Sequence, residues 1–287
     1  MKESPSQKIN RVAPLSCCIC ETDNHNTHYK WVNGYELVKC DECGLVYLDQ
    51  HELEGDFIES SKRDEKKNDT QKIEYWSFPH LYEKYQDVFN GFFQERYERI
   101  YRCNPHAHSL FDIGCGYGFF MNFCSKRGWE AEGIDLSTEA VAYARRQFHL
   151  KATLSTLESF TFTKSYDVMI LCDVLEHLTD PDSQLKRIHD HMDRHGLLFI
   201  QVPNVLGLKI PLNHGYGLPF HLWQFNVKSL TLLLQKNGFR IINYWTGIQG
   251  VIGSYERGGP NLKEKCEWYI ARRLNIGNRL MAIARPG

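Results

Sequence analysis

The chain has 287 residues, of which 42% are hydrophobic and 24% are charged, a composition typical of a globular protein. Its formal net charge of -1 argues against a nucleic-acid partner, because proteins that bind phosphate backbones usually carry a basic excess. The N-terminus, MKESPSQKINRVAP, lacks the apolar core of a secretory signal, and no apolar run is long enough to span a membrane. We therefore expect a cytoplasmic protein with no membrane partner.

Composition and hydrophobic pattern divide the chain into segments. The expected order is a flexible tail (1–14), a cysteine-rich module (15–50), a charged linker (51–74), a helical lid or packing segment (75–108) and a main α/β domain (109–287). In the fourth segment, aromatic residues recur at helical spacing, which favours helices packed on a sheet over a lid.

The cysteine-rich module carries two C-x2-C pairs. Cys17 and Cys20 form the first pair, and Cys40 and Cys43 form the second after an interval of nineteen residues. Two such pairs can complete a tetrahedral thiolate site, which suits zinc, and this spacing lies within the usual range for zinc sites. Four thiolates leave no open coordination position, so the expected zinc is structural. Cys18 is the spare thiol, and a set of free thiols is the alternative reading.

Strands and helices are expected to alternate from residue 109 onward. Apolar strands are expected at 109–114, 130–137, 152–157, 166–174, 196–204, 240–248 and 279–285, and helices at 118–128, 138–148, 180–192 and 227–238. Continuous apolar strands that alternate with helices predict a parallel sheet covered on both faces.

A glycine-rich loop, DIGCGYGFF, follows the first of these strands. Gly114, Gly116 and Gly118 let the backbone turn tightly and approach a ligand closely. Their spacing differs from the G-x-G-x-x-G of dinucleotide sites, and Asp112 would oppose a pyrophosphate but suits a ligand with an ammonium and a sulfonium. Asp135 ends the next strand, where a carboxylate can bind two ribose hydroxyls. The loop favours S-adenosylmethionine over a nucleotide or a purely structural turn.

Several segments together resemble class I S-adenosylmethionine-dependent methyltransferases: DIGCGYGFF, EGIDLS, YDVMILCDVLEHLTDP, GLLFIQVPN and PFHLWQFNVKSLTLLLQKNGF. The cysteine module followed by CGLVYL is similar to the N-terminal zinc ribbon of some bacterial members, which include sugar C-methyltransferases and relatives from polysaccharide or natural-product pathways. The resemblance covers residues 17–50 and about 75–287. It implies an α/β fold with a doubly wound, mostly parallel seven-stranded sheet and a small zinc ribbon.

The resemblance also implies a set of cofactor-binding residues. Asp112, Gly114, Gly116 and Gly118 would cradle the methionine part, Asp135 would hold the ribose, and Leu136 would pack on the adenine; Thr156 and Leu157 would follow the third strand beside the adenine amine, and Cys172 would border the methyl donor. The family usually has an acid where this chain has Thr156.

Two histidines are candidates for the base. Methyl transfer is an in-line displacement that benefits from a positioned acceptor, and a hydroxyl, amine or carbon acid must also lose a proton. His177, in LEHL, follows the fourth strand, where parallel sheets place their ligands, and similar family members use this histidine as a base. His221, in PFHLWQF, lies in a long irregular segment that could cover a substrate. Purely structural roles at a helix start and in a packed loop are the alternatives.

These observations predict an enzyme that transfers a methyl group from S-adenosylmethionine to carbon or oxygen of a small-molecule acceptor. The expected acceptor is a sugar or a nucleotide-linked sugar. One alternative is an RNA methyltransferase that holds its substrate with the zinc ribbon. Another is a non-catalytic S-adenosylmethionine-binding module whose zinc ribbon docks a protein partner.

Overall fold

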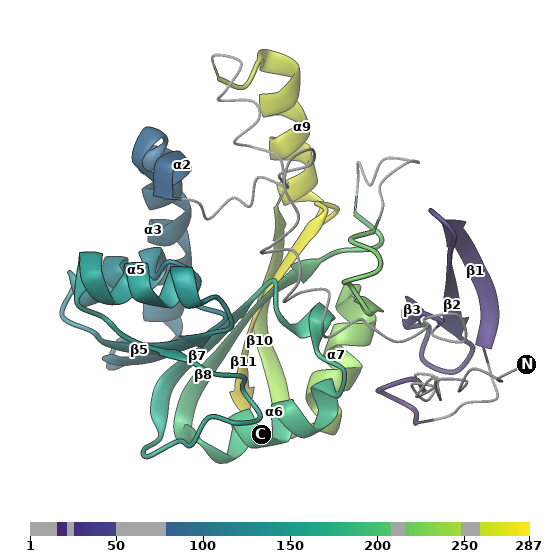
Figure 1. Cartoon of the computed structure of the whole chain (residues 1–287). Helices are drawn as coiled ribbons and strands as arrows, with labels where there is room; N and C mark the ends of the chain where they lie inside the picture. The colour runs from purple at the N-terminus through teal and green to yellow at the C-terminus, as the bar shows by residue number, and fades with distance from the viewer. Residues whose placement is uncertain (1–15, 22–25, 50–78, 208–215, 248–258) are drawn as a thin grey trace, which may run out of the picture.

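The computed structural model describes residues 16–21, 26–49, 79–207, 216–247 and 259–287 (Figure 1). The predicted tail at 1–14 and the whole of the predicted linker at 51–74 lie outside the described residues.

A seven-stranded sheet forms the centre of the molecule. Its strands are β4 (Ser109–Ile113), β5 (Glu130–Asp135), β6 (Lys151–Leu154), β7 (Tyr166–Cys172), β8 (Met192–Pro203), β10 (Phe239–Gly247) and β11 (Arg279–Pro286). They lie in the order β10-β11-β8-β7-β4-β5-β6. The pairs from β8 to β6 are parallel, and β11 is antiparallel to both of its neighbours. The predicted doubly wound, mostly parallel sheet of seven strands is confirmed.

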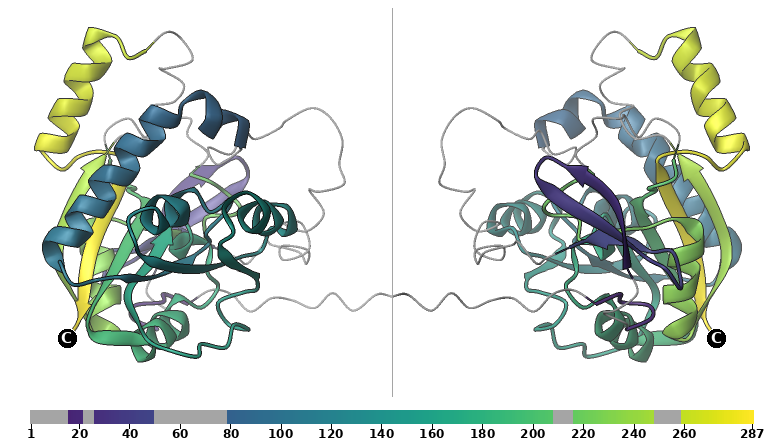
Figure 2. Two further views of the ribbon diagram at one scale, coloured as in Figure 1. Left: turned by 90° about the vertical axis from the view of Figure 1, so that its left-hand side faces the viewer. Right: turned by 90° about the vertical axis from the view of Figure 1, so that its right-hand side faces the viewer.

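Helices cover both faces of this sheet (Figures 1 and 2). The α-helices of the described residues are α2 (Pro79–Lys84), α3 (Gln86–Cys103), α4 (Phe119–Ser125), α5 (Thr138–Phe148), α6 (Pro181–Asp190), α7 (Val227–Lys236) and α9 (Leu262–Arg273), of which α9 extends beyond the end of the sheet. Because successive strand residues point to opposite faces, Val168 and Ile170 of β7 join a core with α3, α4 and α5, while Met169 and Leu171 join a core with α6 and α7.

The helix starts follow local capping chemistry. Asp180 accepts a hydrogen bond from the Ser183 backbone N–H at 3.0 Å, and Pro181 occupies the first turn of α6. Asn226 caps α7 in the same way by accepting from the Ser229 N–H at 3.0 Å. These caps fix where the chain turns back from the carboxyl edge of the sheet, which is the edge that carries the predicted site.

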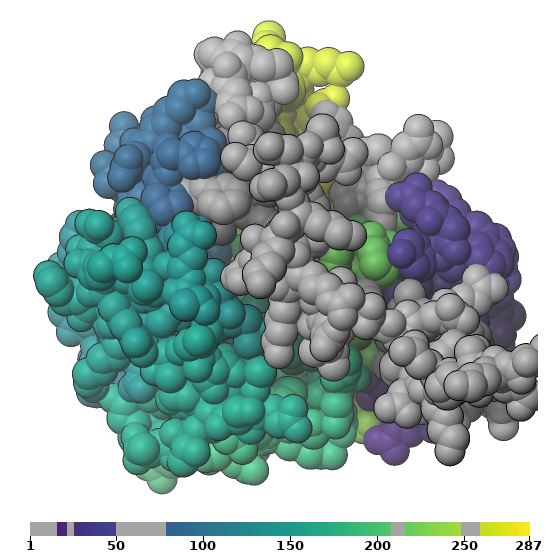
Figure 3. All heavy atoms as spheres, in the orientation of Figure 1, coloured from purple at the N-terminus to yellow at the C-terminus, as the bar shows by residue number. Residues whose placement is uncertain are grey.

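A second, four-stranded sheet contains most of the cysteine module. Its strands are β1 (Asn26–Val32), β2 (Tyr35–Cys40), β3 (Val46–Leu48) and β9 (Trp223–Gln224), in that order. The strand β9 comes from the segment that follows β8, so the main domain supplies one strand to the module's sheet. In the space-filling view, the module lies directly against green residues of the main domain (Figure 3).

Candidate active site

The glycine loop between β4 and α4 has a strained backbone that glycine accommodates. Gly114 has φ +76° and Gly116 has φ +52°, which are left-handed values that L side chains rarely adopt. A Cβ atom at Gly114 would lie 2.4 Å from Cγ2 of Val174, so this glycine allows two loops to pack closely. A Cβ atom at Gly116 would meet no atom within 4 Å among the described residues. Gly116 therefore borders open space that a ligand can enter, and Gly118 caps α4.

Asp135, at the end of β5, braces this loop. Its Oδ2 accepts a hydrogen bond from the Gly116 backbone N–H at 2.7 Å, and its Oδ1 accepts one from the Ser137 N–H at 2.8 Å. A carboxylate can accept about four hydrogen bonds, so lone pairs remain for hydroxyl donors of a ligand. The predicted ribose-binding acid thus lies directly beside the predicted loop.

Asp112 is a buried acid at the end of β4. Its side chain is only 6% exposed, and burial raises its pKa to about 7, while nearby Arg96 lowers the pKa and Asp135 raises it further. A buried carboxylate gains from a cation beside it, because the cation offsets the desolvation of the charged form. The site therefore favours a positively charged ligand group, such as an ammonium, at Asp112.

The predicted adenine-side residues differ in their surroundings. Leu136 is 70% exposed beside Asp135 and offers an apolar surface to a flat ring. Thr156 is exposed, and its hydroxyl accepts from the Ser159 N–H at 3.0 Å, so it stabilises a local turn. Leu157 is 5% exposed and packs in the core. Of these residues, Leu136 has the surroundings best suited to a ring contact.

A polar network lies at the end of β7, beyond the predicted Cys172. Asp173 has φ +57°, and its Oδ1 forms an ion pair with Nη1 of Arg279 at 2.8 Å. Its Oδ2 accepts from Nε2 of Gln201 at 2.9 Å, and Oε1 of Gln201 accepts from Nη2 of Arg96 at 3.3 Å. A non-glycine residue held in this backbone region is often found at a functional site. Sequence reasoning did not identify Arg96, Gln201 or Arg279, because they come from separate elements with no shared motif.

Glu176 is fully buried next to the histidines. It is 0% exposed, and within the described residues neither carboxylate oxygen has a hydrogen-bond partner. Burial, and after it the charge of Asp173, raises the pKa of Glu176 well above its ordinary value. An unpaired charge in such a place is costly, so burial favours the protonated form of Glu176 over the carboxylate.

His177 has a defined tautomer. Its Nδ1 lies 2.9 Å from the Phe220 carbonyl oxygen, which can only accept, so Nδ1 carries the proton and donates. Nε2 of the neutral ring is then the acceptor. The residue is exposed to solvent, but the protein packed around its ring partly desolvates it, and this desolvation lowers the pKa of His177. His177 is therefore a neutral base near pH 7.

The structure brings the two predicted histidines together. The rings of His177 and His221 have centroids 4.7 Å apart and are nearly perpendicular, at 82°. Ligand atoms of Glu176, His177 and His221 all lie within 4.8 Å of one another, so the three side chains could also approach a metal ion together. A Cβ atom at Gly217 would lie 2.2 Å from Nδ1 of His221, so the glycine allows the loop to fold over this ring.

The four predicted zinc ligands also converge. The sulfur atoms of Cys17, Cys20, Cys40 and Cys43 lie within 4.8 Å of one another, and those of Cys17 and Cys43 are 3.5 Å apart. The side chain of Cys18 is not part of this group. Four thiols grouped in this way fit a tetrahedral zinc site, whose sulfur ligands lie about 2.3 Å from the metal.

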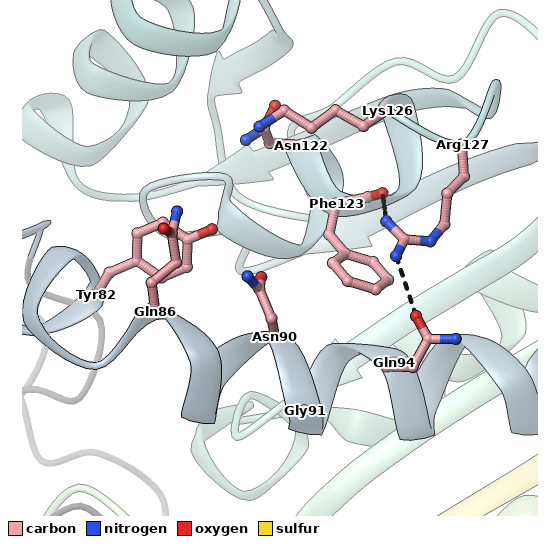
Figure 4. Close-up of a pocket in the computed structure, with 9 residues that line it drawn as sticks. All are labelled: Tyr82, Gln86, Asn90, Gly91, Gln94, Asn122, Phe123, Lys126 and Arg127. Carbon is pink, nitrogen blue, oxygen red and sulfur yellow. Dashed lines mark hydrogen bonds between the residues drawn. The ribbon is translucent and has the colours of Figure 1, made fainter.

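A separate pocket of about 390 Å³ lies between α3 and the end of α4 (Figure 4). Gln94, Asn122 and Arg127 are among its lining residues, and Arg127 donates to Oε1 of Gln94 at 3.0 Å. None of the predicted site residues lines it. The pocket and the predicted site residues therefore occupy different parts of the molecule.

Comparison with known families identifies the class of protein. Residues 58–244 match a family model described as a methyltransferase domain, and this match covers more than half of the chain. The chain belongs to this family, and its seven-stranded sheet has the fold of class I methyltransferases. Within the described residues, no helix is both long enough and apolar enough to cross a lipid bilayer.

Curated relatives support this class over part of their length. A probable S-adenosylmethionine-dependent methyltransferase of Mycobacterium tuberculosis is 28% identical over 165 residues, which cover 53% of this chain and 57% of the relative. A ubiquinone biosynthesis O-methyltransferase of Glaesserella parasuis is 30% identical over 122 residues, which cover 37% of this chain and 52% of the relative. The chain spans about half the length of the curated relatives it matches.

Solved structures share the fold. A SAM-dependent methyltransferase from Archaeoglobus fulgidus matches with a TM-score of 0.51 and 20% identity, over 71% of this chain and 97% of that one. The plantazolicin methyltransferase BpumL, solved in complex with SAH, matches with a TM-score of 0.50 and 16% identity, over 74% of this chain and 92% of that one. At these identities, the likeness concerns the fold alone.

Proposed function

We propose that the protein methylates a small-molecule acceptor whose accepting atom loses a proton, with His177 as the base. The observation that supports this proposal is the neutral His177 ring. Its Nδ1–H is bonded to the Phe220 carbonyl, its Nε2 is an acceptor, and it lies beside His221 at the carboxyl edge of the sheet. Ligands of this type of sheet bind at that edge.

Bound S-adenosylmethionine supplies an electrophilic methyl group on a sulfonium. We assign the residues around it from the geometry of the loop. Asp112 would pair with the ammonium, Asp135 would accept from the ribose hydroxyls, and Leu136 would pack on the adenine. Gly116 would let the backbone approach the ligand, and Gly114 and Gly118 would shape the loop. Thr156, Leu157 and Cys172 are assigned more distant parts of the wall.

The two histidines are given different roles. Nε2 of His177 would take the proton from the accepting atom, and His221 would contact the acceptor and orient it. Because the pKa of His177 is lowered below its ordinary 6.5, the ring stays unprotonated and basic at neutral pH.

A sugar or nucleotide-linked sugar is the acceptor class we propose, with carbon or oxygen as the accepting atom. The support is the similarity of the cysteine module followed by CGLVYL to the zinc ribbon of bacterial members that include sugar C-methyltransferases. The relatives named as ubiquinone biosynthesis O-methyltransferases support an acceptor hydroxyl in more general terms. We further propose that Cys17, Cys20, Cys40 and Cys43 hold one structural zinc ion, which the converging sulfur atoms support.

The test combines acceptor identification with one variant. Mass spectrometry of small molecules that copurify with the protein, followed by transfer of an isotope-labelled methyl group, should show a methylated sugar-containing product. His177→Ala should then lower kcat by roughly 10²–10⁴-fold, the usual contribution of a general base, while the affinity for S-adenosylmethionine changes little. His221→Ala should mainly raise the Michaelis constant of the acceptor. Full turnover in His177→Ala would remove His177 as the base, and methylation of a phenol alone would refute the sugar assignment.

A further inference from the structure

The cysteine module is joined by backbone pairing to the loop of residues 216–226, which carries His221 and is called the catalytic loop below. In β3 and β9, Tyr47 pairs with Trp223 and Val46 pairs with Gln224 in an antiparallel ladder. The Leu48 N–H donates to the Leu222 carbonyl at 2.9 Å and extends the ladder by one residue. The segment that carries His221 is thus held along the edge of the module's sheet.

Trp223 links this ladder to the turn that carries His177. Its indole packs against the ring of Tyr47, with centroids 5.6 Å apart, and it is only 1% exposed. Its Nε1–H donates to the Leu178 carbonyl at 2.7 Å. Since Leu178 follows His177 and Trp223 lies two residues after His221, one side chain spans both histidine-bearing segments and the module.

Further hydrogen bonds close the loop around His221. Gln224 is 2% exposed, and its Nε2 donates to the carbonyl oxygens of Tyr216 at 3.0 Å and His221 at 3.1 Å. The Leu222 N–H donates to the Glu176 carbonyl at 2.8 Å. The loop is therefore fixed at both ends, on one side by the module and on the other by the turn of Glu176 and His177.

The module is anchored to the main domain at a second place. Nζ of Lys236, in α7, donates to the Cys18 carbonyl at 3.0 Å and forms an ion pair with Asp182 of α6 at 3.0 Å. The apolar residues of β2 and β3 share one core with Leu175 and Leu222, whereas α4 and α5 belong to the other core. The module therefore packs against the segments that carry the histidines. The helices α4 and α5, which flank the glycine loop and Asp135, pack in the other core.

We propose that the cysteine module positions the catalytic loop, and that Trp223 is the positioning residue that fixes His221 and His177 relative to each other. The expected effect on turnover rests on the proposed role of the histidines. The structural link between the module and the loop does not depend on that role. The link and the role of the histidines can therefore be refuted separately.

The first test compares two buried tryptophans. Trp223→Phe keeps an aromatic ring against Tyr47 but loses the N–H donated to Leu178. We expect kcat to fall about 10- to 100-fold, the range expected for a small misplacement of a catalytic group, with S-adenosylmethionine affinity unchanged. The acidic limb of the kcat–pH profile should move to higher pH, because a loosened loop hydrates the His177 ring further and its pKa returns toward the ordinary value. Trp129→Phe is the control, since Trp129 is also buried, at 7% exposed, but lies in the other core. A wild-type kcat and pH profile in Trp223→Phe would overturn the role of Trp223 in positioning the two histidines.

The second test measures the link without activity. Hydrogen–deuterium exchange of Cys40→Ser, which opens the cysteine cluster, should show exchange on the order of tenfold faster in residues 216–226 and 175–178, with α5 unchanged. Cys18→Ser is the matched control, because Cys18 lies outside the cluster. Unchanged exchange in β9 despite an opened cluster would overturn the link. If Cys40→Ser also exposes α5, the exchange pattern of Trp223→Phe decides. Faster exchange in β9 of Trp223→Phe, together with full turnover of that variant, would uphold the link between the cysteine module and the catalytic loop. It would overturn the proposed role of the histidines.

Discussion

The raised pKa of Asp112 makes a quantitative prediction about cofactor binding. The pKa is about 7 in the free protein because the carboxyl is buried, and a bound ammonium should lower it far below that value. Binding then requires the ionised form, which is about 3% of the protein at pH 5.5 and about half of it at pH 7 by the linkage relation. The affinity for S-adenosylmethionine should therefore rise about 15-fold over this range, during which the ligand's own amine stays protonated.

Calorimetry in buffers of different ionisation enthalpy measures this effect directly. At pH 6 about 0.9 of a proton should be released for each S-adenosylmethionine bound, since that fraction of Asp112 is protonated beforehand. Asp112→Asn should bind weakly at every pH and release no proton. Glu176→Gln is the control, because Glu176 also has a raised pKa but lies beside the histidines, and this variant should keep the slope. A flat affinity profile in the wild type, or an equal slope in Asp112→Asn, would refute the assignment of Asp112 to the ammonium.

Three further predictions concern the loop, the fold and the metal. Asp135→Ala should weaken S-adenosylmethionine binding by at least about 1.5 kcal/mol in calorimetry, the scale of a charge-assisted hydrogen bond, and an unchanged affinity would remove Asp135 from the site. Burial raises the pKa of Asp112 from 3.8 in the unfolded chain to about 7 in the folded protein. The ionised carboxylate therefore lowers the free energy of unfolding of the ligand-free protein fully above pH 7, and this destabilisation disappears below pH 3.8. Asp112→Asn should accordingly raise the free energy of unfolding by up to about 4 kcal/mol at pH 8 and by almost nothing at pH 3, as denaturant titrations would show. Elemental analysis should find about one zinc per chain, which Cys40→Ser should lose and Cys18→Ser should keep; a folded, metal-free wild type would contradict the zinc site.

The sequence predicts the cofactor side of the site better than the acceptor side. The loop residues from Asp112 to Gly118 are contiguous, and Asp135 follows at the end of the next strand. Local rules therefore suffice: each strand ends at the same edge, and glycines mark the turn. The predicted helix at 138–148 coincides with α5, because Ser137 caps its start and its apolar spacing is regular.

The acceptor side depends on contacts between distant segments. The pairing of β3 with β9 joins residues more than 170 positions apart, and the two-residue strand Trp223–Gln224 is too short for any periodicity to reveal it. The network of Arg96, Gln201 and Arg279 likewise comes from three elements without a common motif. The helix α9 was also missed, because only Ala271 of its residues is buried and its apolar spacing is correspondingly weak.

The alternation of side chains across the sheet explains why these two sides can be separated. Asp112 points to the same face of β4 as Leu110, which belongs to the core that contains α3 and α4. Arg96 of α3 lies near Asp112 on this face. Phe111 and Ile113 point to the opposite face and belong to the core that contains the cysteine module and Leu222. Cofactor binding and acceptor positioning are thus supported from opposite faces of the same strands. Substitutions in the core of the cysteine module should therefore change acceptor parameters first, while the binding of S-adenosylmethionine, held by the other face and by the glycine loop, is the last property to be lost.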